Sequence, residues 1–116
     1  MSESGVSAIR AALERGDAVE AELLARDALD LDPEDALLHA YLGSILMARG
    51  NVTEALPQYQ MAIQQQPEVA AYYNELGNAL AVCGDFEAAA VALREAARLS
   101  PELPEIYNNL GNVLRA

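Results

Sequence analysis

Four columns of identical residues recur down this chain at a spacing of 34 residues, and this period constrains the fold more than any other feature. The columns are Gly16, Gly50 and Gly84; Ala21, Ala55 and Ala89; Pro33, Pro67 and Pro101; and Gly43, Gly77 and Gly111. A fixed period of about 20–50 residues is typical of stacked repeat arrays, in which each unit buries its apolar face against its neighbours. Such arrays usually present a curved surface instead of an enclosed reaction site.

The period divides the chain into units of unequal completeness within a single domain, residues 1–116. A divergent first unit (2–35) precedes two full units (36–69 and 70–103), and a half unit or capping helix (104–116) follows. Hydrophobic residues make up 53% of the chain, and 23 residues are alanine, which has the best intrinsic helix propensity. The composition therefore favours an all-α fold.

Apolar residues step by three or four positions within each full unit, as Tyr73, Leu76 and Leu80 do, which indicates helices. Seven helices are expected at approximately 4–15, 18–31, 35–49, 52–65, 69–83, 86–99 and 103–115. Gly50 and Gly84 are placed to end a helix in the left-handed conformation. The residues that follow them, Asn51 and Asp85, are expected to cap the next helix.

The turns between units each contain a proline followed by a glutamate. We expect Pro33, Pro67 and Pro101 to take the first position of a helix, where a missing N–H is tolerated. Asp32 and Ser100 would then cap those helices. Pro57 lies inside an expected helix, which it should bend.

The periodic columns resemble the signature of the tetratricopeptide repeat family, which combines an aromatic residue, Leu-Gly, a large residue, glycine, small alanines and a closing proline. The aromatic column is His39, Tyr73 and Tyr107; the Leu-Gly pairs are Leu42-Gly43, Leu76-Gly77 and Leu110-Gly111; the large residues are Leu46, Leu80 and Leu114; and the second small column is Ala28, Ala62 and Ala96. The resemblance implies a right-handed superhelical solenoid of antiparallel helix pairs with about 3.5 repeats. In it the Leu-Gly glycines would sit at a helix crossing, with Ala55 and Ala89 facing them.

The resemblance also implies a binding face, because in this family the first helix of each unit lines a concave groove. Ligands are usually extended peptides, held by the fifth and ninth positions of the repeat, which share one helix face. By register these positions are Asn74, Asn78, Asn108 and Asn112, with Ser44 and Arg10 upstream. A ladder of amides can hold a peptide backbone whatever its sequence. The alternative is that these asparagines are solvated polar residues of the helix surface.

Two better-known kinds of tetratricopeptide repeat match this sequence only in part. The clamp that grips chaperone carboxylates adds lysines and arginine, but this chain has no lysine, and only Arg10 and Arg115 are placed near the groove. Carboxylate capture is therefore not predicted. The segment Tyr107-Asn108-Asn109-Leu110-Gly111-Asn112 is similar to the repeats of O-linked N-acetylglucosamine transferases, through the asparagine that precedes Leu-Gly.

Reactive groups do not converge in the sequence. His39 occupies the aromatic column and is interpreted as a packed core residue, and Cys83 is interpreted as a small buried residue. An EF-hand starting at Asp30 fails because Asp35 and Tyr41 stand where glycine and glutamate are required. No phosphate-binding loop or dinucleotide fingerprint is present. We predict no enzyme activity, no metal and no cofactor.

The net charge of −11 comes from 18 acids against seven bases, all of them arginine, and ten of the acids lie in the first 35 residues. So negative a surface repels phosphate backbones and anionic lipids, which argues against nucleic-acid and membrane partners. The acids either maintain solubility or form an N-terminal patch that attracts a basic partner. A single cysteine and the lack of a secretory signal favour the cytoplasm.

The function predicted from these features is a non-catalytic protein-protein interaction scaffold that binds an extended peptide or partner protein. One alternative is the N-terminal targeting arm of a larger enzyme, such as a glycosyltransferase or sulfotransferase. Another is a scaffold that self-assembles by stacking of repeat ends. The last helix has an apolar side, which predicts a homo-oligomer formed through it. That side consists of Ile106, Tyr107, Leu110 and Val113.

Overall fold

The computed structural model describes residues 2–116, with side-chain surroundings from Gly5 onward, and those residues form seven α-helices and no strand. The helices are α1 (Ser2–Glu14), α2 (Ala18–Leu31), α3 (Ala36–Ala48), α4 (Val52–Gln65), α5 (Ala70–Val82), α6 (Phe86–Leu99) and α7 (Pro104–Arg115). Each end lies within two residues of the predicted boundary. The all-α prediction is confirmed.

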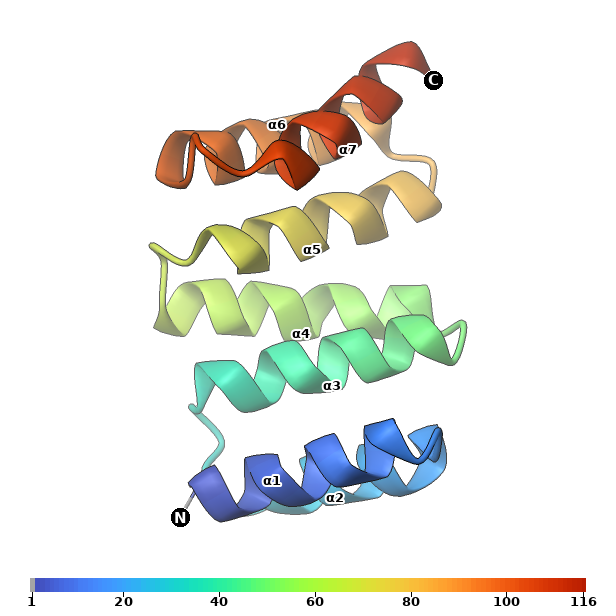
Figure 1. Cartoon of the computed structure of the whole chain (residues 1–116), viewed down its shortest axis with the longest axis vertical. Helices are drawn as coiled ribbons and strands as arrows, with labels where there is room; N and C mark the ends of the chain where they lie inside the picture. Colours follow the sequence, from blue (N-terminus) through green and yellow to red (C-terminus); the bar gives the residue numbers. More distant parts are fainter. Residues whose placement is uncertain (1) are drawn as a thin grey trace.

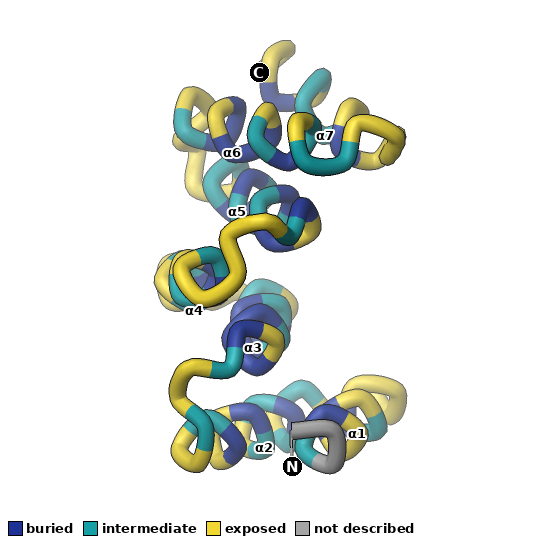
Figure 2. Tube along the Cα trace, turned by 90° about the vertical axis from the view of Figure 1, so that its left-hand side faces the viewer, coloured by how far each residue is buried: buried dark blue, intermediate teal, exposed yellow. Residues whose placement is uncertain are grey.

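The helices stack along the long axis of a 39 × 26 × 21 Å molecule, with α1 and α2 side by side at one end, α6 and α7 side by side at the other, and the two termini at opposite ends (Figure 1). Every helix packs against the next one in sequence, and among the first helices of the units α3 also contacts α5, and α5 contacts α7. Figure 2 shows the buried residues on the sides of the helices that face their neighbours, while turns and outer faces are exposed. The molecule is a solenoid of helix pairs, as predicted. None of the described helices is long and apolar enough to cross a membrane.

Helix α3 lies deepest in the stack and supplies most of the large buried side chains. Leu38, Leu42, Ile45 and Leu46 are at most 1% exposed, and they form one apolar cluster with Ile9 of α1. Burying a leucine or isoleucine of this kind stabilises the fold by about 1.5–3 kcal/mol. The largest part of the core is therefore built around α3.

The first helix of each complete unit ends as the sequence predicts. Gly84 has φ = 85°, and its N–H bonds the carbonyl of Ala81 at 3.0 Å, while the N–H of Asp85 bonds the carbonyl of Leu80 at 3.0 Å. These two bonds define a Schellman motif, which satisfies carbonyls at the helix end. The same arrangement recurs at Gly16 and Gly50.

The predicted caps are only partly correct. The Asp85 carboxylate accepts a hydrogen bond from the N–H of Ala88, but Asn51 makes no such bond with its side chain. At the turn between the first two units the cap of α3 is Asp35, not Asp32, and Pro33 lies outside the helix. The reason is that Pro33 takes the second position of a turn closed by Asp35 N–H and Asp32 C=O at 3.2 Å.

Gly43 and Gly77 lie at helix crossings, but large side chains face them instead of the alanines that the sequence suggested. Gly111 was expected at a crossing as well, but a Cβ there would meet only Nη1 of Arg115, in its own helix, at 3.6 Å. A Cβ on Gly43 would lie 2.7 Å from the ring of Tyr59, and one on Gly77 would lie 2.7 Å from Cγ of Leu93. Ala89 contributes only its carbonyl oxygen, 3.2 Å from the same point. Gly43 and Gly77 therefore make room for the bulky residue of the paired helix.

Pro57 lies inside α4, on its exposed side, and the helix continues from Val52 to Gln65. The proline therefore does not end the helix, and the bend that it should cause stays a prediction.

Candidate functional site

Polar side chains connect the first helices of successive units. Three side-chain hydrogen bonds, each between residues 31 positions apart, join α1 to α3, α3 to α5 and α5 to α7. They are Arg10 Nε to the Tyr41 hydroxyl at 2.7 Å, Ser44 Oγ to Glu75 Oε1 at 3.2 Å, and Asn74 Nδ2 to Glu105 Oε2 at 3.1 Å. The regular spacing follows from the repeat, because each bond crosses from one unit to a position three residues earlier in the next.

The fifth-position residue is buried in each unit that another unit follows. Val6, Ala40 and Asn74 are at most 7% exposed, whereas Asn108 on α7 is exposed. Asn74 also accepts a hydrogen bond of 3.0 Å from Nδ2 of Asn109. Its amide therefore joins α5 to α7, a structural role that the sequence analysis did not anticipate.

The residues of the ninth-position column are more exposed than those of the fifth. Ser44 and Asn78 are partly exposed, and Arg10 and Asn112 are exposed. Asn112 accepts a hydrogen bond of 2.5 Å from Nη2 of Arg115 on its own helix. Of the asparagines predicted to form a ladder, Asn78, Asn108 and Asn112 therefore remain open to solvent.

A hollow of ≈ 260 Å³ lies on this face between α3 and α5. It is lined by Leu37, Ala40, Tyr41, Ser44, Ala71, Tyr72 and Glu75. Only Ser44 among them was predicted as a site residue. The sixth-position residues Tyr41 and Glu75 were missed, although the sequence carried a signal, because positions six and nine are three residues apart and share a helix face.

Glu75 is the charged residue of this hollow. Burial raises the pKa of its carboxyl, the hydrogen bond from Ser44 lowers it, and the carboxylate of Glu105 raises it. Behind Ser44, the Tyr59 hydroxyl donates to Ser44 Oγ at 3.4 Å, and burial raises the pKa of Tyr59 to about 12. A hydrogen-bond chain thus runs from the core of the second unit to the hollow.

The ion pairs of the described residues lie away from this hollow. They are Arg15–Glu20, Arg26–Glu22, Arg26–Glu54, Arg49–Glu22 and Arg98–Glu95. All the acids in these pairs belong to α2, α4 and α6, the second helices of their units. The carboxylates of Glu75 and Glu105 on the first helices therefore have no cationic partner within residues 5–116.

The two residues considered for chemistry behave differently from each other. His39 is 8% exposed, with Nε2 2.7 Å from the carbonyl oxygen of Pro33 and Nδ1 2.8 Å from Oε1 of Gln58, so its interpretation as a packed core residue is confirmed. Cys83 is exposed, and the prediction of burial is wrong, because it caps the end of α5 where no helix covers it. Within residues 5–116 no three His, Cys, Asp or Glu side chains are grouped to hold a metal ion.

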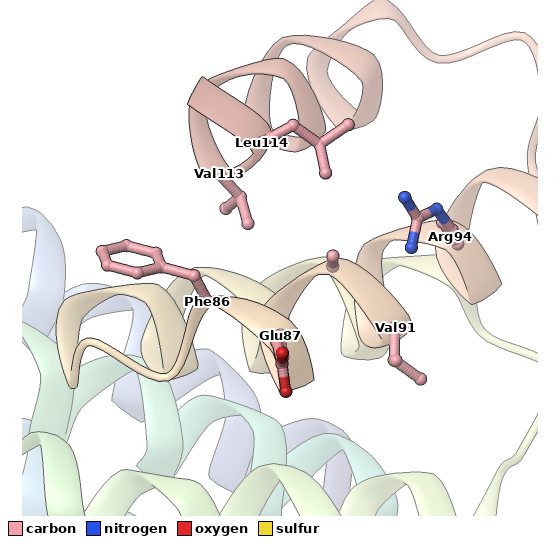
Figure 3. A pocket seen from close by; sticks show the side chains of 7 residues that line it. Phe86, Glu87, Val91, Arg94, Val113 and Leu114 are labelled. Carbon is pink, nitrogen blue, oxygen red and sulfur yellow. The ribbon is translucent and has the colours of Figure 1, made fainter. Parts of the chain in front are cut away.

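A second hollow, of ≈ 450 Å³, opens between α6 and α7 (Figure 3). Phe86, Val91 and Leu114 around it are 41%, 67% and 57% exposed, and Arg94 lies at its edge. The apolar side expected on α7 is only partly open, since Ile106 is fully buried. Val113 is also buried, and Tyr107 is exposed.

Comparisons with known families agree with this geometry. A model described as a tetratricopeptide repeat matches residues 7–70, more than half of the chain, and one described as a TPR repeat matches residues 77–115. No curated protein sequence matches the chain.

Solved structures resemble the whole stack. An O-GlcNAc transferase mutant from Thermobaculum terrenum is 25% identical, with a TM-score of 0.91 over 97% of this chain, which spans only 22% of that protein. The second TPR domain of human RPAP3, in complex with the HSP70 peptide SGPTIEEVD, is 17% identical, with a TM-score of 0.92 over 97% of this chain and 94% of that one. The Yersinia enterocolitica secretion chaperone SycD, in complex with a YopD peptide, is 18% identical, with a TM-score of 0.89 over 97% and 92% of the two chains.

Proposed function

The chain belongs to the tetratricopeptide repeat family, and from that premise we propose that it is a non-catalytic scaffold that binds an extended segment of a partner protein along the face of α1, α3, α5 and α7. The hollow of ≈ 260 Å³ between α3 and α5 is the observation that carries this proposal. It lies between two first helices, on the face that holds the ninth-position column. Structures of the same fold are described as complexes with peptides, which supports the same use here.

The proposed contacts differ along the groove. Asn78, Asn108 and Asn112 have exposed or partly exposed amides that can donate to and accept from a peptide backbone. Ser44 borders the hollow, and Arg10 lies at the α1 end, where it holds Tyr41. Asn74 supports the groove from beneath through its bonds to α7.

Paired amide substitutions test this site. A pull-down from the native cell identifies the partner, and its affinity is then measured for the double variant Asn78→Ala with Asn112→Ala. We expect binding to be lost while the thermal midpoint stays within a few degrees. The matched control is Gln60→Ala with Gln64→Ala, which removes two exposed amides from α4 and should leave the affinity unchanged. Unchanged affinity in the asparagine variant places the site elsewhere.

Self-assembly is a second candidate function, favoured by the apolar hollow between α6 and α7 (Figure 3). Exposed large apolar residues that gather in one place mark association surfaces more often than isolated ones do. Light scattering over a range of concentrations tests it: growth of the apparent mass that Leu114→Glu abolishes supports stacking. A strict monomer at high concentration eliminates it.

The third candidate, a targeting arm of a larger enzyme, rests on the likeness to the Thermobaculum terrenum transferase. Since this chain spans 22% of that protein, the activity of the transferase is carried over only as a proposal. Sequencing the gene beyond the codon for Ala116 tests it directly. A glycosyltransferase or sulfotransferase domain in the same reading frame supports this candidate, and an immediate stop codon rules it out.

A further inference from the structure

We infer that the hollow between α3 and α5 receives an arginine or lysine side chain, so that the groove selects basic segments of a partner protein. The inference rests on the proposed function and specifies the chemistry of its ligand. It is opposite in charge to the acidic peptide SGPTIEEVD described with the RPAP3 domain.

The walls of the hollow suit the stem of a long cationic side chain. Leu37, Ala40 and Ala71 provide apolar surface, and Tyr41 and Tyr72 provide aromatic rings. Lysine and arginine bury their methylene groups against apolar surface while the charged end seeks a polar partner. Aromatic faces attract such cations, by about 0.5–1 kcal/mol at exposed sites.

Glu75 provides the partner for the charged end. Its Oε1 accepts the hydrogen bond from Ser44, and no donor among residues 5–116 bonds its other oxygen, Oε2. Glu75 is partly exposed and lines the hollow, so this oxygen is open to a ligand. A guanidinium or ammonium group that binds there supplies the countercharge that the protein lacks, and a charge-assisted hydrogen bond is about twice as strong as a neutral one.

The charges around the hollow point to the same kind of ligand. Glu105 is close enough to Glu75 to raise the pKa of its carboxyl, and neither acid forms an ion pair within the described residues. The cation Arg10 lies at the rim, but its Nε is bonded to the Tyr41 hydroxyl and not to either carboxylate. With a net charge of −11, the whole molecule attracts basic segments and repels acidic ones.

A displayed library of random linear peptides, selected on the full chain, tests the inference. We expect enriched peptides to share an arginine or lysine at a fixed position. A synthetic copy of the most enriched peptide should bind Glu75→Gln about tenfold more weakly than the unaltered chain, because the amide keeps the Ser44 bond but loses the charge. The matched control is Glu102→Gln, which removes an exposed acid from the turn before α7 and should leave the affinity nearly unchanged.

Each other result overturns a specific statement. Enrichment of acidic or neutral peptides contradicts the inference while the proposed peptide-binding function stands. Equal affinity for Glu75→Gln and the unaltered chain, with both folded by circular dichroism, also contradicts it. If no peptide of any composition is enriched, the peptide-binding proposal itself fails and this inference fails with it.

Discussion

The hydroxyl of Ser44 donates a hydrogen bond of 3.2 Å to Oε1 of Glu75, and so joins the first helices of two successive units at the hollow between them. Ser44 is supported in turn by Tyr59, which packs against Gly43 at the crossing of α3 and α4. The core packing of one unit therefore fixes the position of a carboxylate in the next. Glu75 therefore belongs both to the contacts between units and to the hollow that we propose as the ligand site.

Replacement of Glu75 should change how the stability of the protein depends on pH. Burial raises the pKa of its carboxyl, so the folded protein binds this proton more tightly than the unfolded chain does. The stability from this group is complete below the pKa of the unfolded state, about 4.3, and is lost as pH rises through the folded value. The free energy of unfolding, measured in urea, should therefore fall with rising pH in the unaltered chain because of this group. The difference, Glu75→Gln minus the unaltered chain, should accordingly shift in favour of the variant as pH rises to neutrality.

The control for that titration is Glu34→Gln, since Glu34 is an exposed acid in the turn before α3. It measures the effect of replacing an acid by an amide away from the hollow, at the same pH values. A difference that stays constant with pH for Glu75→Gln contradicts the raised pKa of its carboxyl.

Replacement of the Leu-Gly glycines by alanine should have opposite effects on stability in different units. Gly77→Ala places a Cβ 2.7 Å from Leu93 and 3.2 Å from a backbone oxygen, so we expect a loss of about 1–3 kcal/mol in the free energy of unfolding. At Gly111 the nearest atom is Nη1 of Arg115 at 3.6 Å, so Gly111→Ala should gain up to about 1 kcal/mol of helix propensity. Chemical denaturation measures the free energy of unfolding of both variants. Equal changes contradict the conclusion that Gly77, but not Gly111, lies at a tight helix crossing.

Asn74 and Asn108 occupy the same position of successive repeats, yet their replacement should differ in cost. Asn74 is 7% exposed and bonds Glu105 and Asn109, so Asn74→Ala should lower the free energy of unfolding by about 1–3 kcal/mol. Asn108 is exposed, and Asn108→Ala should stay within about 0.5 kcal/mol of the unaltered chain. Thermal unfolding of the two single variants measures this difference in stability. Similar midpoints contradict the role of Asn74 in joining α5 to α7.

Cys83 should react with a thiol reagent in the native protein. It is exposed at the end of α5, and no disulfide protects it. A chromogenic disulfide reagent should modify one thiol without denaturant, at a rate close to that of the unfolded chain. Cys83→Ser serves as the blank and should unfold at the same temperature. Modification that requires denaturant contradicts the exposed position.

The helices could be predicted from the sequence because their signals are local. Gly84 needs a left-handed backbone, and Asp85 after it caps the next helix, so the end of one helix and the start of another are specified within two residues. The turn at Pro33 was misread because proline suits both the first position of a helix and the second position of a turn. A local signal that fits two structures cannot choose between them.

The binding face was predicted only in outline. The register placed Asn74 and Asn78 on one side of α5, which is a property of that helix alone. Whether a side chain there meets solvent depends on the approach of α7, which buries Asn74 and leaves Asn78 partly open. The period thus determined which helices form and in what order they stack. The tertiary structure alone decided which groups the neighbouring helix covers, and so placed Glu75 in the hollow, because that depends on distances between residues about 30 positions apart.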